Sequence, residues 1–579
     1  LSDPDDARFA YALSQGGRLR RIDLVTGERK DILPPVPDNV ELRLNWDAAS
    51  ALDPFDPAVI YLGSQFVHRS GDRGKMWKTI SPDLTNDEAV NYQDAPGVTN
   101  DPETYGSILT IAPSPVERGV IWVGTDDGNV QITPNRGDSW TNVTENVPGV
   151  PSGTWIPHIE PSEFKAGAAF VVFDDHRRGN WTPYVYETLD YGQTWRSLVT
   201  NDLWGYAHTL EQDPINGDLL FLGTEFGLYV SVDAGESWFK WKNGLPTVPV
   251  RGLVVHPRDY DLVIGTHGRG AYILDDIRPL RGLTSELLES PLHLFEIPPA
   301  QQHALRQPHG YPMASDAMFR GESRAYGAPI TYVTNPSNES ADAVVTVMDS
   351  AGAVLRTMRS PAKRGMNRIV WNLRRDLFRI PTPPTEQGPA EGAELPAGRY
   401  TVRVSVGDHQ ASQSVLIRPD LRNTISAEIR AIKFEAVMRT GFRMEVIGEA
   451  LERIRNTRTE IQEFLDERTT RNDPTAAEFV REGQALDSTL GQLSIALLGS
   501  RSQPSPLRKL RYVYSALTSS WEQPTEAELT YLRQAEASLT EALQKLNGVY
   551  TTEVAAFRHR VEARGLGQFS DYEPLDLDW

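Results

Sequence analysis

Polar side chains suited to binding or catalysis recur at one kind of position in the first half of this 579-residue sequence. Each follows an apolar run that ends in Gly-Thr or Gly-Ser, and the four residues are Gln65, Asp126, Glu225 and His267. Equivalent positions of a repeat converge in space, so we expect these side chains on one face of the protein. Two carboxylates there would support acid–base chemistry, and all four groups form hydrogen bonds of the kind that bind sugars or peptides.

The segments that lead into the repeats add aromatic and basic side chains to this face. They are Asn45, Trp46, Tyr105, Trp155, His158, Tyr206, His208 and Arg251, with Arg269 just after His267. We predict a face that binds a sugar or a peptide by stacking and polar contacts, with Asp126 and Glu225 as the acid–base pair if the protein is an enzyme. The alternative is that these side chains only bond the loop backbone and exclude water.

No metal or cofactor motif accompanies these residues. His158, His208 and His267 lack a local ligand pattern such as His-Glu-x-x-His, and the chain has no cysteine. The glycine-rich stretch 265–270 lies between two predicted strands rather than before a helix, which argues against a phosphate-binding loop. We therefore predict neither a metal ion nor a cofactor.

A recurring octet, Ser/Thr-x-Asp/Asn-x-Gly-x-x-Trp, sets the spacing of the repeats. Its Asp or Asn can bond the N–H groups of its own turn, its Gly can take a positive φ, and its Trp can anchor the next strand. Because the same position recurs in every copy, we predict a structural role for the octets. The four copies are Ser70, Asp72, Gly74 and Trp77; Thr133, Asn135, Gly137 and Trp140; Thr188, Asp190, Gly192 and Trp195; and Ser231, Asp233, Gly235 and Trp238.

Short apolar runs around each octet give units of about four strands, which is typical of β-propeller blades. About five units lie at about 1–40, 43–95, 104–147, 155–203 and 206–245, with closing strands at 250–276. The predicted fold is mainly β with an α tail, with propeller blades over residues 1–280. Because a closed propeller usually needs more blades, we expect N-terminal blades from the same gene product or from a companion chain.

The octets resemble the Asp boxes of sialidases, sortilins and xyloglucanases. The segments that begin at Pro246 and Leu262 also look like those of large secreted bacterial sortilin-like Asp-box (BNR-type) proteins. The resemblance covers roughly residues 1–280. It implies an exported protein, periplasmic or extracellular, in a group that is mostly of unknown activity.

The second half predicts four further segments. Residues 281–325 form a connector, 326–419 a small Ig-like β-sandwich that resembles the FlgD-type module, 420–565 an antiparallel helical bundle, and 566–579 an acidic tail that docks back on the body. A surface loop is expected at 381–394, and Thr525 to Glu528 form a capping box that begins a helix. The sialidase-like motif Phe378 to Pro381 follows all the octets, so we regard it as a coincidence.

Composition limits the classes of function. The formal charge of −20 disfavours nucleic-acid binding, and no apolar run approaches the roughly 18 residues of a membrane span. The leading hypothesis is an exported non-enzymatic binding or assembly protein that recognises a protein or a glycan on the propeller face. The alternative is a glycoside hydrolase of the xyloglucanase or sialidase-like type, which requires two carboxylates across a cleft.

Overall fold

The computed structural model describes residues 1–14, 17–36, 40–86, 105–304, 322–336, 341–379, 392–470, 477–499 and 505–577. The chain divides into two compact units, Leu1–Thr284 and Ser285–Trp579. Each unit is described by itself.

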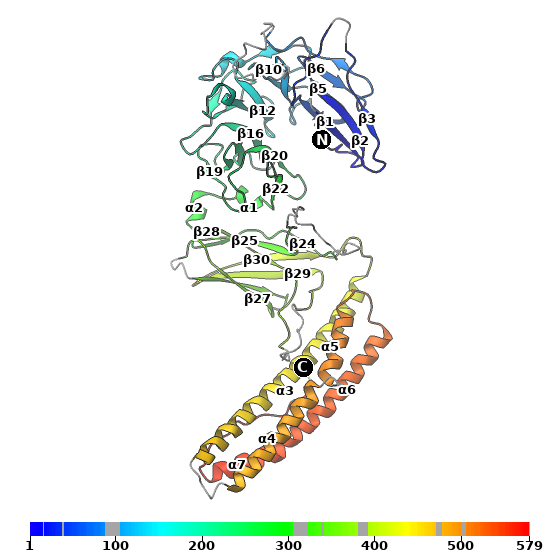
Figure 1. Ribbon diagram of the computed structural model, residues 1–579, viewed down its shortest axis with the longest axis vertical. Coiled ribbons are helices and arrows are strands. Elements are labelled where there is room, and N and C mark those ends of the chain that lie inside the picture. The colour runs from blue at the N-terminus through cyan, green and yellow to red at the C-terminus, as the bar shows by residue number, and fades with distance from the viewer. Residues whose placement is uncertain are drawn as a thin grey trace. The chain divides into compact units, whose positions relative to one another are not determined.

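The first unit is built from antiparallel sheets that follow one another in chain order (Figure 1). Four of the sheets have four strands, and the first and last have three strands among the described residues. The strands are β1 (Phe9–Ser14), β2 (Arg18–Asp23) and β3 (Arg29–Asp31); β4 (Ser50–Asp53), β5 (Asp56–Gly63), β6 (Val67–Ser70) and β7 (Lys78–Thr79); β8 (Ile108–Pro113), β9 (Ile121–Thr125), β10 (Val130–Thr133) and β11 (Thr141–Asn142); β12 (Trp155–Pro161), β13 (Ala169–Asp174), β14 (Tyr184–Thr188) and β15 (Arg196–Ser197); β16 (Ala207–Gln212), β17 (Leu220–Thr224), β18 (Gly227–Ser231) and β19 (Phe239–Lys240); and β20 (Val250–Val255), β21 (Leu262–Thr266) and β22 (Ala271–Leu274). The fold is of the propeller type, as the repeats predict.

The octets close the hairpins between the third and fourth strands. In the first copy the Ser70 hydroxyl donates to Asp72 Oδ1 at 2.9 Å and accepts from the Gly74 N–H at 2.9 Å, while Asp72 Oδ1 also accepts from the Met76 N–H at 2.8 Å. Gly74 has a φ of 83°, and a Cβ added there would lie 2.7 Å from the Ile32 side chain of the preceding sheet. The turn therefore needs glycine for its backbone conformation and for its close contact with the sheet before it.

A second glycine packs against the following sheet in the second, third and fifth sheets. It lies near the end of the second strand, and an added Cβ would lie 2.8 Å from Ile108 at Gly63, 2.4 Å from Ile156 at Gly124, and 2.8 Å from the Val250 side chain at Gly223. Each of these contacts reaches the first strand of the next sheet. The Gly-Thr and Gly-Ser pairs in the sequence thus mark positions where neighbouring sheets pack closely.

The second unit contains two packed sheets and a group of helices. One sheet has the order β23-β25-β28 and the other β24-β30-β29-β26-β27. The strands are β23 (Leu292–Leu294), β24 (Ala300–Gln301), β25 (Ala328–Thr334), β26 (Asp342–Met348), β27 (Val354–Pro361), β28 (Gly365–Trp371), β29 (Gly398–Val406) and β30 (His409–Arg418). Buried Trp371 and Tyr332 lie in the core between the sheets.

Part of the predicted connector differs from the expectation. Its residues form the short helix α2 (Ser285–Leu288) and contribute β23 and β24 to the two sheets, after helix α1 (Arg278–Arg281) has ended the first unit. The cause is that Leu294, Ile297 and Ala300 are buried in the core of these sheets. The remainder of the connector over 305–321 and most of the predicted loop 381–394 lie outside the described residues.

The helices are α3 (Ala427–Thr470), α4 (Ala477–Leu498), α5 (Pro506–Leu517), α6 (Glu526–Val549) and α7 (Ala555–Ala563). The capping box is confirmed, because Thr525 accepts from the Glu528 N–H and the Glu528 side chain accepts from the Thr525 N–H. In the tail, Leu575 is buried against the helices and exchanges two hydrogen bonds with the Asn547 side chain.

Candidate functional site

A cluster of aromatic and titratable side chains lies where three segments of the fourth and fifth sheets meet. We call it the Tyr206 cluster, and its members are Asp174, His176, Trp181, Tyr206, His208 and Glu225. They come from the end of β13 and the loop after it, from the entry to β16, and from the hairpin between β17 and β18. Such loops are short connections that start and end on rigid strands, so the strands fix their positions.

Tyr206 is the centre of the cluster. The His176 ring stacks on it at a centroid distance of 4.4 Å and an angle of 14°, and the Trp181 ring lies 5.4 Å away. His208 meets Tyr206 edge to face at 4.9 Å. The buried tyrosine ring thus holds three other rings in fixed orientations.

Two carboxylates are bound to this aromatic core. Asp174 Oδ1 lies 2.6 Å from His176 Nδ1, and Glu225 Oε2 lies 3.0 Å from His208 Nε2. Burial, followed by a hydrogen bond to Glu225, raises the pKa of the Tyr206 hydroxyl well above its ordinary value. Burial lowers the pKa of His208, which favours a neutral imidazole whose tautomer is set by Glu225.

Exposed tryptophans lie beside the buried part of the cluster. Trp181 is 59% exposed and Trp204 is 71% exposed, and the Trp204 ring lies 6.2 Å from Phe226, the residue after Glu225. The guanidinium carbon of Arg177 lies 3.5 Å from the ring centroid of Trp155. Exposed aromatic side chains beside fixed polar groups offer a surface on which a ligand can stack.

No family model matches the chain, and no curated protein matches it. Solved structures do match, at probability 1.00. A GH74 xyloglucanase from Xanthomonas campestris is 20% identical with a TM-score of 0.36, over 48% of this chain and 44% of that one. An ancestral GH74 enzyme is 14% identical with a TM-score of 0.30, over 56% and 39% of the two chains. YCF48 bound to D1 peptide is 13% identical with a TM-score of 0.25, over 47% and 90%.

The chain thus spans less than half the length of both GH74 enzymes. Propellers with and without enzyme activity are among these structures, and likenesses this weak carry no argument about function. The Tyr206 cluster has to be interpreted from its own geometry.

Three of the predicted face residues, Tyr206, His208 and Glu225, meet in the cluster. Two others border it: Trp155 pairs with Asp174 across β12 and β13, and the charge of Arg251 acts on both Tyr206 and His208. Trp46, His267 and Arg269 are exposed, and Tyr105 is partly exposed. Whether these side chains share one ligand stays a prediction.

Asp126 has a different environment from Glu225. It is fully buried, where Oδ1 accepts from the backbone N–H groups of Gly106 and Ser107 and Oδ2 accepts from the side chains of Asn45 and Ser107, all at 2.7–2.9 Å. Burial raises its pKa to about 7. These four bonds favour a structural role for Asp126 and argue against its pairing with Glu225 as an acid–base couple.

Asn45 and Gln65 are also structural. Asn45 is buried, its side-chain amide donates to Asp126 Oδ2 at 2.9 Å, and its Oδ1 accepts from the Asp47 N–H at 3.0 Å. Gln65 accepts from the Arg43 N–H and donates to the Glu41 carbonyl, both at 2.9 Å. For these side chains the alternative interpretation, that they satisfy the loop backbone, is the better one.

Sequence reasoning missed Asp174, His176 and Trp181. The Gly-Thr pair that marks this position in other sheets is absent from the fourth sheet, where Asp174 pairs with Trp155 as Thr125 pairs with Ile108. The available signal was the run 174–181, which carries acidic, basic and aromatic residues directly after the apolar run 169–173.

His158, another predicted face residue, lies beside half-buried carboxylates. Its Nε2 lies 2.8 Å from the Leu210 carbonyl and 3.6 Å from Glu160. Glu160 on β12 and Glu211 on β16 interact electrostatically, and Glu211 accepts from the Val255 N–H at 2.8 Å. Burial, with the charge of a neighbouring carboxylate, raises the pKa of Glu160 to about 8 and that of Glu211 well above its ordinary value.

We expect this group to make the first unit less stable as pH rises from 6.5 to 8. The folded protein retains protons on Glu160 and Glu211, whereas the unfolded chain, with carboxyl pKa values near 4.5, has released them. The stability that these two groups contribute is therefore full below pH 4.5 and is lost as pH rises through 8. Below pH 6.5 buried His68, with a pKa lowered to about 4, acts in the opposite direction.

Urea unfolding at constant ionic strength measures how steeply the free energy of unfolding falls between pH 6.5 and 8. Glu160→Gln should make this slope shallower, whereas the exposed control Glu236→Gln should leave it unchanged. A slope that is unchanged in Glu160→Gln would contradict the assignment.

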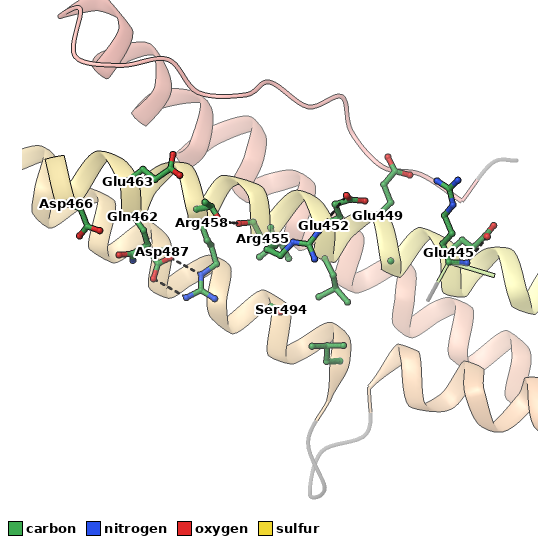
Figure 2. Close-up of a pocket in the computed structure, with 16 residues that line it drawn as sticks. Glu445, Glu449, Glu452, Arg455, Arg458, Gln462, Glu463, Asp466, Asp487 and Ser494 are labelled. Carbon is green, nitrogen blue, oxygen red and sulfur yellow. Dashed lines mark hydrogen bonds and ion pairs between the residues drawn. The ribbon is translucent and has the colours of Figure 1, made fainter. Parts of the chain in front are cut away.

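The second unit has a long groove along α3 and α4, with a volume of about 1110 Å³ (Figure 2). Its charged side chains pair with one another: Arg458 bonds Asp487 at 2.8 and 3.2 Å, and Arg455 lies 3.6 Å from Glu452. Figure 2 shows Arg458 of α3 and Asp487 of α4 reaching toward each other between the two helices. The groove is therefore a solvated charged surface.

Among the described residues, no helix is long and apolar enough to cross a membrane, and no group of three or more His, Asp or Glu side chains is placed to hold a metal ion.

Proposed function

We propose that this chain is an exported binding protein whose Tyr206 cluster recognises a glycan. The observation that carries the proposal is that exposed Trp181 packs on Tyr206 and exposed Trp204 on Phe226, while the carboxylates Asp174 and Glu225 bond the two histidines that contact Tyr206. The apolar face of a sugar ring stacks on an aromatic ring, and its hydroxyls donate to carboxylates, so this combination suits an oligosaccharide. Stacking and hydrogen bonds among Asp174, His176, Tyr206, His208 and Glu225 order these side chains before a ligand binds, which lowers the entropic cost of binding.

A glycan microarray, followed by calorimetric titration of the best oligosaccharide, tests this function. We expect saturable 1:1 binding to the full chain. If the chain binds peptides but no glycan, the ligand of the cluster is a protein rather than a glycan. If it binds neither class, the proposed recognition role is wrong.

The glycoside hydrolase alternative is reduced to one pair of carboxylates. Asp126 is bonded within the protein, so the carboxylates that the Tyr206 cluster offers as acid and base are Asp174 and Glu225. Chromatography of the bound oligosaccharide after long incubation decides between the two functions. Cleavage by the wild-type chain that is lost in Asp174→Asn and Glu225→Gln would establish glycoside hydrolase activity. An oligosaccharide that stays intact would support binding without hydrolysis.

The sortilin-like Asp-box resemblance, the Ig-like character of the two packed sheets and the export of the protein are part of the same proposal. So is the expected partner, the N-terminal propeller blades of the same gene product or a companion chain, of which we place an Asp-box sheet on the last sheet of the first unit. Its support is the outer face of β20–β22, where Val254, Val263 and Ile273 form one cross-strand row. Val254 is 58% exposed and Ile273 is 63% exposed.

The glycine pattern indicates what covers this face. Gly265 occupies the position of Gly63, Gly124 and Gly223, yet an added Cβ there meets only the backbone of Gly252, at 3.5 Å or more. At those three glycines the position receives a β-branched side chain from the next sheet. A sheet of the same kind therefore fits the face better than an unrelated partner does.

Intact mass and peptide mapping of the native purified particle test this partner. We expect additional peptides with the octet pattern. Peptide mapping then shows whether they belong to this polypeptide or to a companion chain. A native particle without further octets would contradict the proposal.

A further inference from the structure

The second unit contains a pocket of about 770 Å³ that none of the preceding functions uses. It is lined by the first turns of α3, by the segment that follows α5, and by residues near the ends of β24 and β30. This volume falls within the range of sites that bind small molecules. Its wall combines apolar Phe434 and Val437 with Trp521 and several basic side chains.

Arg430 is the unusual residue in this wall. It is only 4% exposed, its Nε donates to the Ile425 carbonyl at 3.3 Å, and its guanidinium carbon lies 5.5 Å from the Trp521 ring centroid. Its Nη2 is buried without a hydrogen-bond partner. A buried guanidinium with an unsatisfied N–H is costly, because it has lost water without gaining an acceptor.

Three carboxylates line the pocket: Glu522 is exposed, and the other two, Glu394 and Asp420, are bound to other groups. Glu394 accepts from the Tyr326 hydroxyl at 2.5 Å, and Asp420 bonds Arg422 at 2.6 and 2.9 Å. Buried Lys433 lies 3.4 Å from Glu528, a long contact to a carboxylate that also closes the α6 capping box. Among the described ion pairs, Arg430 has no acidic partner, and the N-terminal end of the 44-residue helix α3 adds positive potential at the same place.

We propose that this pocket binds a small organic anion through a carboxylate or phosphate group. Arg430 and Lys433 hold the anionic group, with a small rotation of the Arg430 side chain to present Nη2, while Trp521 and Phe434 contact the apolar part of the ligand. The site is in the second unit, so it is independent of glycan binding by the first unit.

Calorimetric titration of the full chain at low ionic strength tests the site, with citrate and inorganic phosphate as separate probes. We expect saturable 1:1 binding of at least one probe, weakened by added salt, and the better probe distinguishes a carboxylate site from a phosphate site. Arg430→Met should weaken binding at least tenfold, and Lys433→Met should weaken it by a smaller factor.

Arg439→Met is the matched control, because Arg439 lies on the same helix but pairs with Glu536 outside the pocket. It should retain wild-type affinity. Helical content from circular dichroism checks that the variants fold, and Lys433→Met provides a second test if Arg430→Met unfolds. Absence of 1:1 binding by both probes, or equal affinity in the folded Arg430→Met protein, would overturn the proposal.

Discussion

The Gly124→Val variant is expected to destabilise the first unit by about 1–3 kcal/mol or more, which is the range for overpacking a filled interface. A Cβ at Gly124 lies 2.4 Å from Ile156 and 2.8 Å from Thr110, both in neighbouring strands. The backbone of β9 is extended and tolerates valine, so the cost arises from the contact between sheets rather than from the strand itself. The midpoint of thermal unfolding, followed by the β-sheet signal in circular dichroism, measures the effect.

Gly265→Val is the matched control, since it makes the same change at the equivalent position of the last sheet. An added Cβ at Gly265 makes only ordinary van der Waals contact with the Gly252 backbone, at 3.5 Å or more, so this variant of the chain alone should unfold within about 0.5 kcal/mol of wild type. In the native particle the same change should prevent a further sheet from packing, and the partner sequence should no longer remain associated. Equal destabilisation by the two variants would contradict the packing argument, and retention of the partner by Gly265→Val would contradict the proposed interface.

Trp181→Ala should weaken glycan binding about 30-fold, because removal of a central aromatic side chain from a binding site commonly costs about 2 kcal/mol. The exposed ring contacts Tyr206 but contributes little to the core, so the folded state should persist. Calorimetric titration of the glycan selected on the microarray measures the change in affinity.

Ile215→Ala is the control for this variant, since Ile215 is also an exposed apolar side chain but lies in the turn between β16 and β17, at the opposite end of those strands from Tyr206 and Glu225. Its affinity for the glycan should equal that of wild type. If Trp181→Ala binds as tightly as wild type while Glu225→Gln does not, the aromatic platform is not part of the site and recognition is purely polar.

Local patterns in the sequence were sufficient to predict the repeats and their turns. The bonds around Ser70, Asp72 and Gly74 join residues within four positions of one another, so they depend on the octet alone. The capping box at Thr525 is equally local. The alternation of apolar residues likewise indicated strands in the second unit, although it did not reveal that residues 292–294 and 300–301 join its sheets.

The candidate site depended on contacts between distant parts of the chain. Asp126 and Glu225 occupy equivalent positions after a Gly-Thr pair, and the sequence offered no means to distinguish them. Asn45, Gly106 and Ser107 surround Asp126 with donors, whereas Glu225 meets His208 and Tyr206 beside exposed tryptophans. The repeat determined where each carboxylate lies along its strand, but the neighbouring loops, 17 to 81 residues away, decided whether it is buried and fully bonded or available to a ligand.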